Sequence, residues 1–139
     1  MEYTRRHFGV YGLAEQDGKV LLIKKARGPY TGRYDLPGGS PEAHETPTET
    51  LIREVMEETG LIAKPLSDGH FIEAYFTDFI EDDGRAGCLY HQGLIFKMDV
   101  SGDLKKQGDG LDSNGGVWVE KSEINERNAS AFVMQLLKK

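Results

Sequence analysis

Two apolar segments near the start of the chain form the first clear pattern. Residues 7–14 and 19–26 are rich in β-branched and aromatic side chains, and the turn sequence Gln16-Asp17-Gly18 lies between them. This arrangement predicts a β-hairpin. The second segment, KVLLIKKA, is almost continuously apolar before it becomes basic, so we expect it to lie inside a sheet.

A helix is predicted next. It follows a stretch rich in glycine and proline, RGPYTGRYDLPGGSPEAHE, which we interpret as a long ordered loop. Thr46 and Glu49 have the spacing of a capping box, with Pro47 at the first helical position. We therefore expect a helix from Pro47 to Thr59 that ends at Gly60.

The following part of the chain predicts mainly strands. Residues 71–80 and 89–100 flank the turn-rich residues 81–84, a pattern typical of a second hairpin with long strands. A loop rich in glycine and aspartate, residues 101–116, then leads to a short strand at residues 117–120.

Helical spacing returns at the C-terminal end, from about residue 122 to residue 139. The apolar positions that show it are Ile124, Phe132, Val133, Leu136 and Leu137. Strands on both sides of one helix, with a second helix at the end, predict a layered α/β or α+β domain. Because we find no internal repeat and no linker, we expect residues 1–139 to form a single domain.

Composition and charge narrow the class of protein. The chain has 38% hydrophobic and 29% charged residues, as ordinary globular proteins do. Its net charge of −6 argues against nucleic acid as a partner, because such binding needs a basic surface. The sequence shows a single cysteine, Cys88, with no signal-peptide pattern and no apolar run long enough to cross a bilayer. We therefore expect a cytoplasmic protein without a membrane partner.

The predicted helix carries a face of glutamates. At about 100° per residue, Glu54, Glu57 and Glu58 lie together, and the apolar positions occupy another arc. These like charges repel one another, and hard cations such as Mg²⁺ or Mn²⁺ bind carboxylates. The alternative is a solvated face on which Arg53 balances the charge through i,i+4 pairs with Glu49 and Glu57. Spacing alone does not distinguish between these two interpretations.

A longer motif does distinguish them. Its residues are Gly39, Glu45, Arg53-Glu54, Val55, Glu57-Glu58, Gly60 and Leu61, and Leu36-Pro37-Gly38 lead into it. At this spacing they resemble a complete Nudix box, so the chain looks like a MutT-like member of the Nudix hydrolase family. The resemblance implies an α/β fold of the Nudix type, which is an α/β/α sandwich with a central mixed β-sheet.

The resemblance also implies which residues act. Glu54, Glu57 and Glu58 would bind Mg²⁺ or Mn²⁺ as the cofactor, together with the backbone carbonyl of Gly38. Arg53 would orient these carboxylates through ion pairs.

Three further points about the catalytic group follow from the same resemblance. Glu45 would either contribute to the metal site or hold Arg53. Together with Arg53, Glu54 and Glu57 it completes the expected catalytic set. The general base is left open between Glu54 or Glu57 and the aspartates of the later loop, Asp109 and Asp112, which could equally belong to a polar turn.

The candidates for binding substrate lie around the glycine loop. Gly39 is included as a backbone position, and Arg33 is one of four upstream basic residues that could meet substrate phosphates, with Lys24, Lys25 and Arg27. Tyr34 is one of five aromatic residues that could stack on a nucleobase, with Phe8, Phe76, Tyr90 and Trp118. Strand aromatics more often lie in the core.

The reaction implied by the family is attack by water on a phosphorus atom of a nucleoside diphosphate linked to another moiety. Our leading expectation is a normal or oxidised (d)NTP, hydrolysed to the nucleoside monophosphate and pyrophosphate. The alternatives are an ADP-ribose or nucleotide-sugar pyrophosphatase and a non-catalytic Nudix ligand-binding module. The segment HFIEAYFTDF lacks the proline that ADP-ribose pyrophosphatases tend to carry after the box, which counts against ADP-ribose. A second copy of the chain is a candidate partner, because exposed edge strands could pair between copies.

Overall fold

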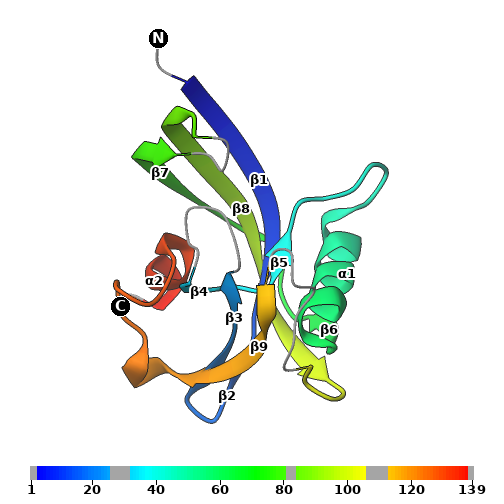
Figure 1. Ribbon diagram of the computed structural model, residues 1–139. Coiled ribbons are helices and arrows are strands. Elements are labelled where there is room, and N and C mark those ends of the chain that lie inside the picture. Colours follow the sequence, from blue (N-terminus) through cyan, green and yellow to red (C-terminus); the bar gives the residue numbers. More distant parts are fainter. Residues whose placement is uncertain (1–2, 26–31, 81–83, 106–112, 138–139) are drawn as a thin grey trace.

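The computed structural model describes residues 3–25, 32–80, 84–105 and 113–137 (Figure 1). Within these ranges the elements are β1 (Tyr3–Leu13), β2 (Glu15–Gln16), β3 (Lys19–Lys25), β4 (Tyr34–Asp35), β5 (Gly38–Gly39), α1 (Pro47–Thr59), β6 (Ile62–Pro65), β7 (His70–Ile80), β8 (Ala86–Ser101), β9 (Ser113–Glu120), the 3₁₀ helix η1 (Lys121–Glu123) and α2 (Ala131–Leu137).

The strands form two sheets. In the first, the order is β5-β1-β8-β6, and β7 also pairs with β8. The long β1 and β8 run parallel, from Tyr3 opposite Gly87 to Leu13 opposite Lys97, and the other pairs are antiparallel. The second sheet joins β2, β3 and β4, with β9 along the other side of β3, and its pairs are all antiparallel. The first sheet is therefore mixed, as the family resemblance implied.

The strands lie between the two helices, with α1 on one side and α2 on the other (Figure 1). On the α1 side the buried core consists of Val10, Ala14, Leu21, Leu51, Val55, Leu61, Ala63, Phe96 and Met98. On the α2 side it consists of Tyr11, Leu13, Val20, Leu22, Leu36, Ile72, Ile95, Val119, Ala129, Phe132 and Val133. Adjacent residues of β1 belong to different clusters, so this strand is buried on both faces.

The predicted helix over Pro47–Thr59 is confirmed. The Thr46 hydroxyl accepts a hydrogen bond from the Glu49 amide at 3.2 Å, and the Glu49 carboxylate accepts one from the Thr46 amide at 3.0 Å. Gly60 ends the helix in the left-handed conformation, with a φ of 77°. The capping box and the terminal glycine therefore fix both ends of the element that carries the glutamates.

The first predicted hairpin is wrong in its pairing. Asp17 and Gly18 both have positive φ, as a tight turn requires, but only the short β2 pairs with β3 beyond the turn. Most of residues 7–14 belong to β1, which lies in the first sheet and pairs with β8. In this central position both faces of β1 are covered, by the core on the α1 side and the core on the α2 side, whereas an isolated two-stranded hairpin would leave them exposed. Residue 26, the end of the predicted second strand, lies outside the described residues.

The second predicted hairpin is confirmed as the antiparallel pair of β7 and β8, and the strand predicted at residues 117–120 is part of the longer β9. The C-terminal helix is shorter than predicted, because α2 begins only at Ala131. Before this helix, the side-chain oxygen of Asn125 accepts a hydrogen bond from the backbone amide of Arg127 at 2.8 Å. Such local bonds favour a turn over a helix.

No helix in the described part of the chain is long and apolar enough to cross a membrane.

We predict that Thr46→Ala lowers the free energy of unfolding by about 1 kcal/mol, because the amide of Glu49 loses its hydrogen-bond acceptor. Urea denaturation measures this change. Thr48→Ala, an exposed change within the first turn of α1, is the matched control and should not destabilise the protein. Equal destabilisation by both changes would contradict the role of the cap.

Candidate functional site

Glu58 lies at the centre of the candidate site. Although it is charged in water, its side chain in α1 is only 1% exposed. The backbone amide of Gly38 in β5 donates a hydrogen bond to its carboxylate at 2.7 Å. Burial raises the pKa of Glu58 well above its usual range, and the nearby charge of Glu54 adds to this, whereas the bond from Gly38 and the charge of Lys25 oppose it. The helix thus presents a desolvated carboxylate directly to the glycine strand.

Gly38 must be glycine for this approach, and a side chain at Gly39 would displace the carboxylate of Glu54. A Cβ atom on Gly38, whose φ is 148°, would lie 2.1 Å from the carbonyl oxygen of Val10 in the neighbouring β1. A Cβ atom on Gly39 would lie 2.7 Å from the carboxyl carbon of Glu54. The glycines therefore allow α1 and β1 to pack against β5 at the same time.

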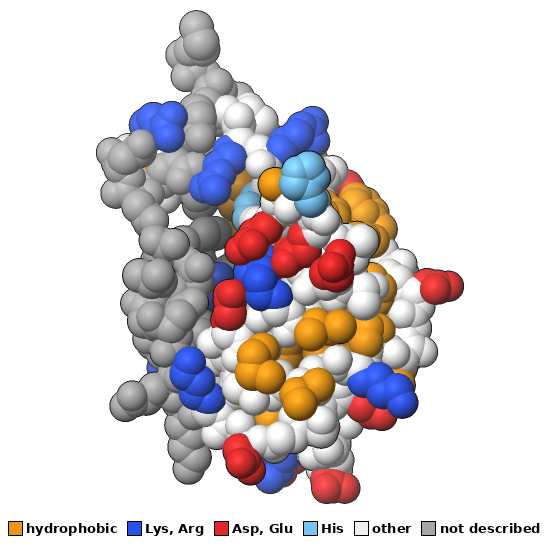
Figure 2. Space-filling model, turned by 90° about the vertical axis from the view of Figure 1, so that its right-hand side faces the viewer, with side chains coloured by type: hydrophobic (Ala, Val, Ile, Leu, Met, Phe, Trp, Pro, Cys, Tyr) orange, Lys and Arg blue, Asp and Glu red, His pale blue; other side chains and the backbone are white. Residues whose placement is uncertain are grey.

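Arg53 connects the other acidic side chains of the site. Its guanidinium makes two hydrogen bonds to Glu45, at 2.7 and 2.9 Å, and one to Glu54 at 2.8 Å. Its contact with the Glu57 carboxylate is longer, at 3.3 Å. On the face of the molecule that α1 occupies, acidic and basic side chains gather in one cluster (Figure 2).

These bonds keep Glu45 and Arg53 charged. The hydrogen bonds from Arg53 are the main reason that the pKa of Glu45 falls to about 2. In turn, the hydrogen bond to Glu45 raises the pKa of Arg53. The pair therefore stays ionised throughout the neutral range.

The chemistry of this cluster fits a hard divalent cation. Four glutamates, at positions 42, 45, 54 and 57, form ion pairs with the single guanidinium of Arg53, and Glu58 lies near Glu54, so negative charge is in excess. Carboxylate oxygens are the ligands that Mg²⁺ and Mn²⁺ prefer. Among the described residues, however, no three His, Cys, Asp or Glu side chains converge closely enough to hold a metal ion. In this conformation Arg53 and the Gly38 amide hold the carboxylates instead.

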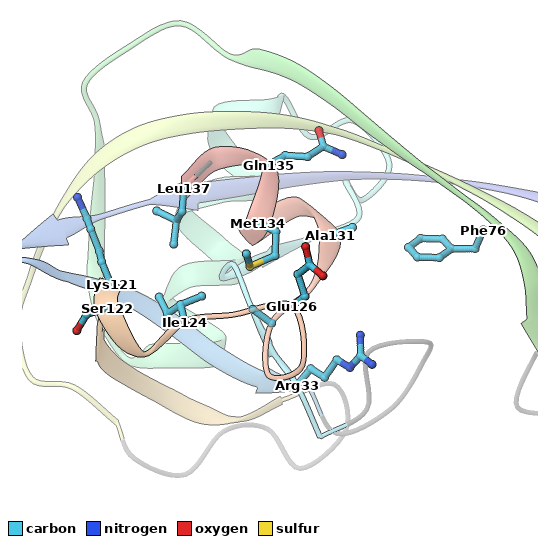
Figure 3. A pocket seen from close by; sticks show the side chains of 11 residues that line it. Arg33, Phe76, Lys121, Ser122, Ile124, Glu126, Ala131, Met134, Gln135 and Leu137 are labelled. Carbon is cyan, nitrogen blue, oxygen red and sulfur yellow. The ribbon is translucent and has the colours of Figure 1, made fainter. Parts of the chain in front are cut away.

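A second feature is a pocket with a volume of about 710 Å³. It is lined by Arg33, Phe76, Lys121, Ser122, Ile124, Glu126, Ala129, Ala131, Met134, Gln135 and Leu137. Arg33 and Phe76 lie toward one end, and Lys121 and Ser122 lie at the other, with α2 between them (Figure 3). The pocket combines an apolar wall with a few charged groups, as small-molecule sites commonly do.

The structure divides the residues that the sequence singled out. Those of the box lie together: Gly38, Gly39, Glu45, Arg53, Glu54, Glu57 and Glu58. Arg33 lies in the pocket, whereas the side chain of Tyr34 packs against the core on the α2 side. Asp109, Asp112 and Arg27 lie outside the described residues.

Of the aromatic candidates, Phe76 lines the pocket. Tyr90 instead stacks on Tyr75 with 4.3 Å between ring centroids, and Trp118 packs against the core on the α1 side. Residues 121–137 contribute most of the pocket lining, which was not predicted, because their pattern indicated only a helix with a buried face. Asn125 and Asn128, which form a turn before α2, were the available sign that these residues are not all helical.

Comparison with known proteins agrees with the fold. The sequence matches the NUDIX domain family over residues 3–137. The ADP-ribose pyrophosphatase of Methanocaldococcus jannaschii is 37% identical over 77% of this chain and 59% of its own length. A MutT-like protein of Streptomyces ambofaciens is 28% identical over 90% of this chain and 70% of its own. This chain thus spans less than two thirds of the M. jannaschii protein.

A solved structure shows the same architecture. The crystal structure of a MutT NUDIX hydrolase from Burkholderia pseudomallei superposes with a TM-score of 0.71, at 19% identity and 96% coverage of both chains. The family match extends from β1 to the last residue of α2, and it includes the glycine strand and the glutamate helix. The chain therefore belongs to the Nudix family.

Proposed function

We propose that this chain is a divalent-metal-dependent pyrophosphohydrolase that cleaves a nucleoside diphosphate linked to another moiety. One observation carries the proposal: the buried carboxylate of Glu58 meets the backbone of Gly38, beside the carboxylates that Arg53 holds. Burial raises the pKa of Glu58, so its ionised form is costly unless a cation is part of its working environment.

Glu54, Glu57 and Glu58, with the carbonyl of Gly38, would hold Mg²⁺ or Mn²⁺. When bound, the cation neutralises phosphate charge and lowers the pKa of the attacking water. Binding would require the side chains of Glu54 and Glu57, which are 17% and 49% exposed, to shift toward the cation while Arg53 keeps its hydrogen bonds to Glu45. Glu58 is already fixed by its bond to Gly38.

The remaining groups of the box have positioning roles. Glu45 accepts two hydrogen bonds from Arg53 and one from the Thr50 hydroxyl at 2.8 Å, so it fixes the guanidinium on α1. Arg53 then orients the carboxylates of Glu54 and Glu57. The proton of the attacking water would go to one of these two glutamates, of which Glu57 is the more accessible to solvent, or to Asp109 or Asp112, which lie outside the described residues.

The pocket would hold the organic part of the substrate. Residues 33–39 connect the two places directly, because Arg33 lines the pocket and Gly38 and Gly39 form β5. An extended segment of this length spans at most roughly 20 Å, which suits a substrate that reaches from a diphosphate to a nucleoside. In this arrangement Arg33 supplies positive charge and Phe76 an apolar surface.

Two substrate classes have support. Similarity to the relative named ADP-ribose pyrophosphatase favours ADP-ribose as the substrate. The proline missing after the box counts against it. The relative named MutT-like favours a (d)NTP. Both contain the nucleoside diphosphate that the proposal requires, so a direct comparison of the two classes decides between them.

We expect the purified chain to release a nucleoside monophosphate in the presence of Mg²⁺ or Mn²⁺. The panel includes dNTPs, oxidised dGTP, ADP-ribose and nucleotide sugars. Glu57→Gln and Glu58→Gln should each lower kcat/KM by at least about a hundredfold, because each removes a charged ligand. Glu73→Gln, an exposed change on β7, is the control. If no substrate turns over and the metal neither binds nor stabilises the protein, the non-catalytic binding module becomes the better interpretation.

Arg33→Gln should raise KM for the best substrate about tenfold and leave kcat within about twofold, because it removes a charged contact far from the reacting phosphorus. Steady-state kinetics separate the two constants. Lys64→Gln, an exposed change in β6, is the control. A fall in kcat with an unchanged KM would contradict this assignment.

The stability contributed by Glu45 should depend on pH. Its pKa falls from 4.5 to about 2 on folding, so the folded state favours the ionised form. Wild type should therefore be more stable than Glu45→Gln above about pH 4.5, and this advantage should disappear as the pH falls toward 2. Urea denaturation at several pH values tests this. Glu42→Gln removes a charge 3.6 Å from the same guanidinium, and an identical pH dependence in this variant would contradict the role of Glu45.

A further inference from the structure

Asp35 is a buried acid that the Nudix box does not include. Its side chain is only 2% exposed, and its Oδ1 atom accepts two hydrogen bonds. The Ser130 hydroxyl donates one at 2.7 Å, and the Leu36 amide donates the other at 2.8 Å. Burial raises the pKa of Asp35, whereas the charge of Lys25 and these two bonds oppose the change. A carboxylate is a costly group to bury for local structure alone.

One of these bonds connects β4 to the start of α2. Ser130 is fully buried and directly precedes the helix, and its hydroxyl oxygen also accepts a hydrogen bond from the Val133 amide at 3.3 Å, as an N-cap residue does. The backbone continues the contact. The Tyr34 amide donates to Asn128 at 2.7 Å, and the Ser130 amide donates to Tyr34 at 2.8 Å. The strand and the helix that forms the pocket wall are therefore joined through Asp35 and its neighbours.

Along the chain, Asp35 is also close to the glutamate site. It lies three residues before Gly38, whose amide binds Glu58. The charge of Asp35 acts on Glu58, and the charge of Lys25 acts on both acids, so the three groups share one electrostatic environment. Two residues before Asp35, Arg33 lines the pocket. Asp35 thus lies between Arg33, which lines the pocket, and Gly38, which binds Glu58.

We propose that Asp35 is a positioning residue that, through Ser130, fixes the α2 wall of the pocket relative to the Gly38–Glu58 contact. This inference rests on the proposed function, because it concerns a substrate that spans both places. Asp35 touches neither the substrate nor the metal in this scheme. Its contribution is the fixed distance between the group that binds the nucleoside and the group that binds the diphosphate, on which the rate depends.

The test uses Asp35→Ala, Ser130→Ala, the double variant and Asp35→Asn, with the best substrate from the panel. Each single alanine variant should lower kcat/KM on the order of tenfold, since it removes a hydrogen bond to a carboxylate. The double variant should be no worse than Asp35→Ala, because both changes break the same link. Asp35→Asn should remain nearer to wild type, because its side-chain oxygen can still accept the bond from Ser130.

A binding measurement separates this role from general damage to the fold. The affinity for Mn²⁺ alone, measured by calorimetry without nucleotide, should stay within about twofold of wild type in Ser130→Ala, because Glu58 and Gly38 keep their contact. Ile72→Val, a buried change in β7, is the control for lost stability and should not alter kcat/KM.

The outcomes are distinguishable. If Asp35→Ala and Ser130→Ala both leave kcat/KM unchanged, this inference is overturned and the proposed function is not. Additive losses in the double variant would have the same meaning, as would a loss in Asp35→Asn as large as that in Asp35→Ala. Absence of turnover by the wild-type chain would overturn the proposed function and this inference with it.

Discussion

The close packing of α1 against a strand of two glycines is the constraint on which the site depends. Gly38 leaves no room for a side chain against the backbone of Val10, and a side chain at Gly39 would displace the Glu54 carboxylate. Since the amide of Gly38 then meets the carboxylate of Glu58, the helix is fixed in rotation as well as in distance. The rotation determines which side chains face the glycines and which face solvent. Arg53 and Glu57 consequently lie at the rim, where charged groups remain hydrated.

The helix and its face of glutamates could be predicted because their determinants are local. Thr46, Glu49 and Gly60 act within a turn or two of their own positions, and the glutamate spacing defines a face whatever the rest of the fold. The sequence also indicated both interpretations of the cluster, and the structure combines them. Arg53 pairs with Glu57 as on a solvated face, while Glu58 is withdrawn from solvent.

Other parts could not be predicted because distant residues determine them. The partner of β1 is β8 rather than β3, and no local pattern in residues 7–14 distinguishes a hairpin from a central strand. The two-residue strands β4 and β5 are too short to show a period. The proposed role of Asp35 likewise depends on its hydrogen bond with Ser130, which is far along the chain. An acid next to Leu36-Pro37 looks like an ordinary loop residue until its partner is known.

The parallel pair of β1 and β8 has a consequence for how the chain acquires its structure. Each residue of β1 pairs with a residue of β8 roughly eighty positions later in the chain. Closing a loop of this length costs conformational entropy before the contacts between the strands can compensate for it. During synthesis β1, β3 and α1 therefore leave the ribosome well before β8 exists. Until then, both faces of β1 lack part of their final packing. This strand is therefore a segment of the nascent chain that needs protection from association with other chains.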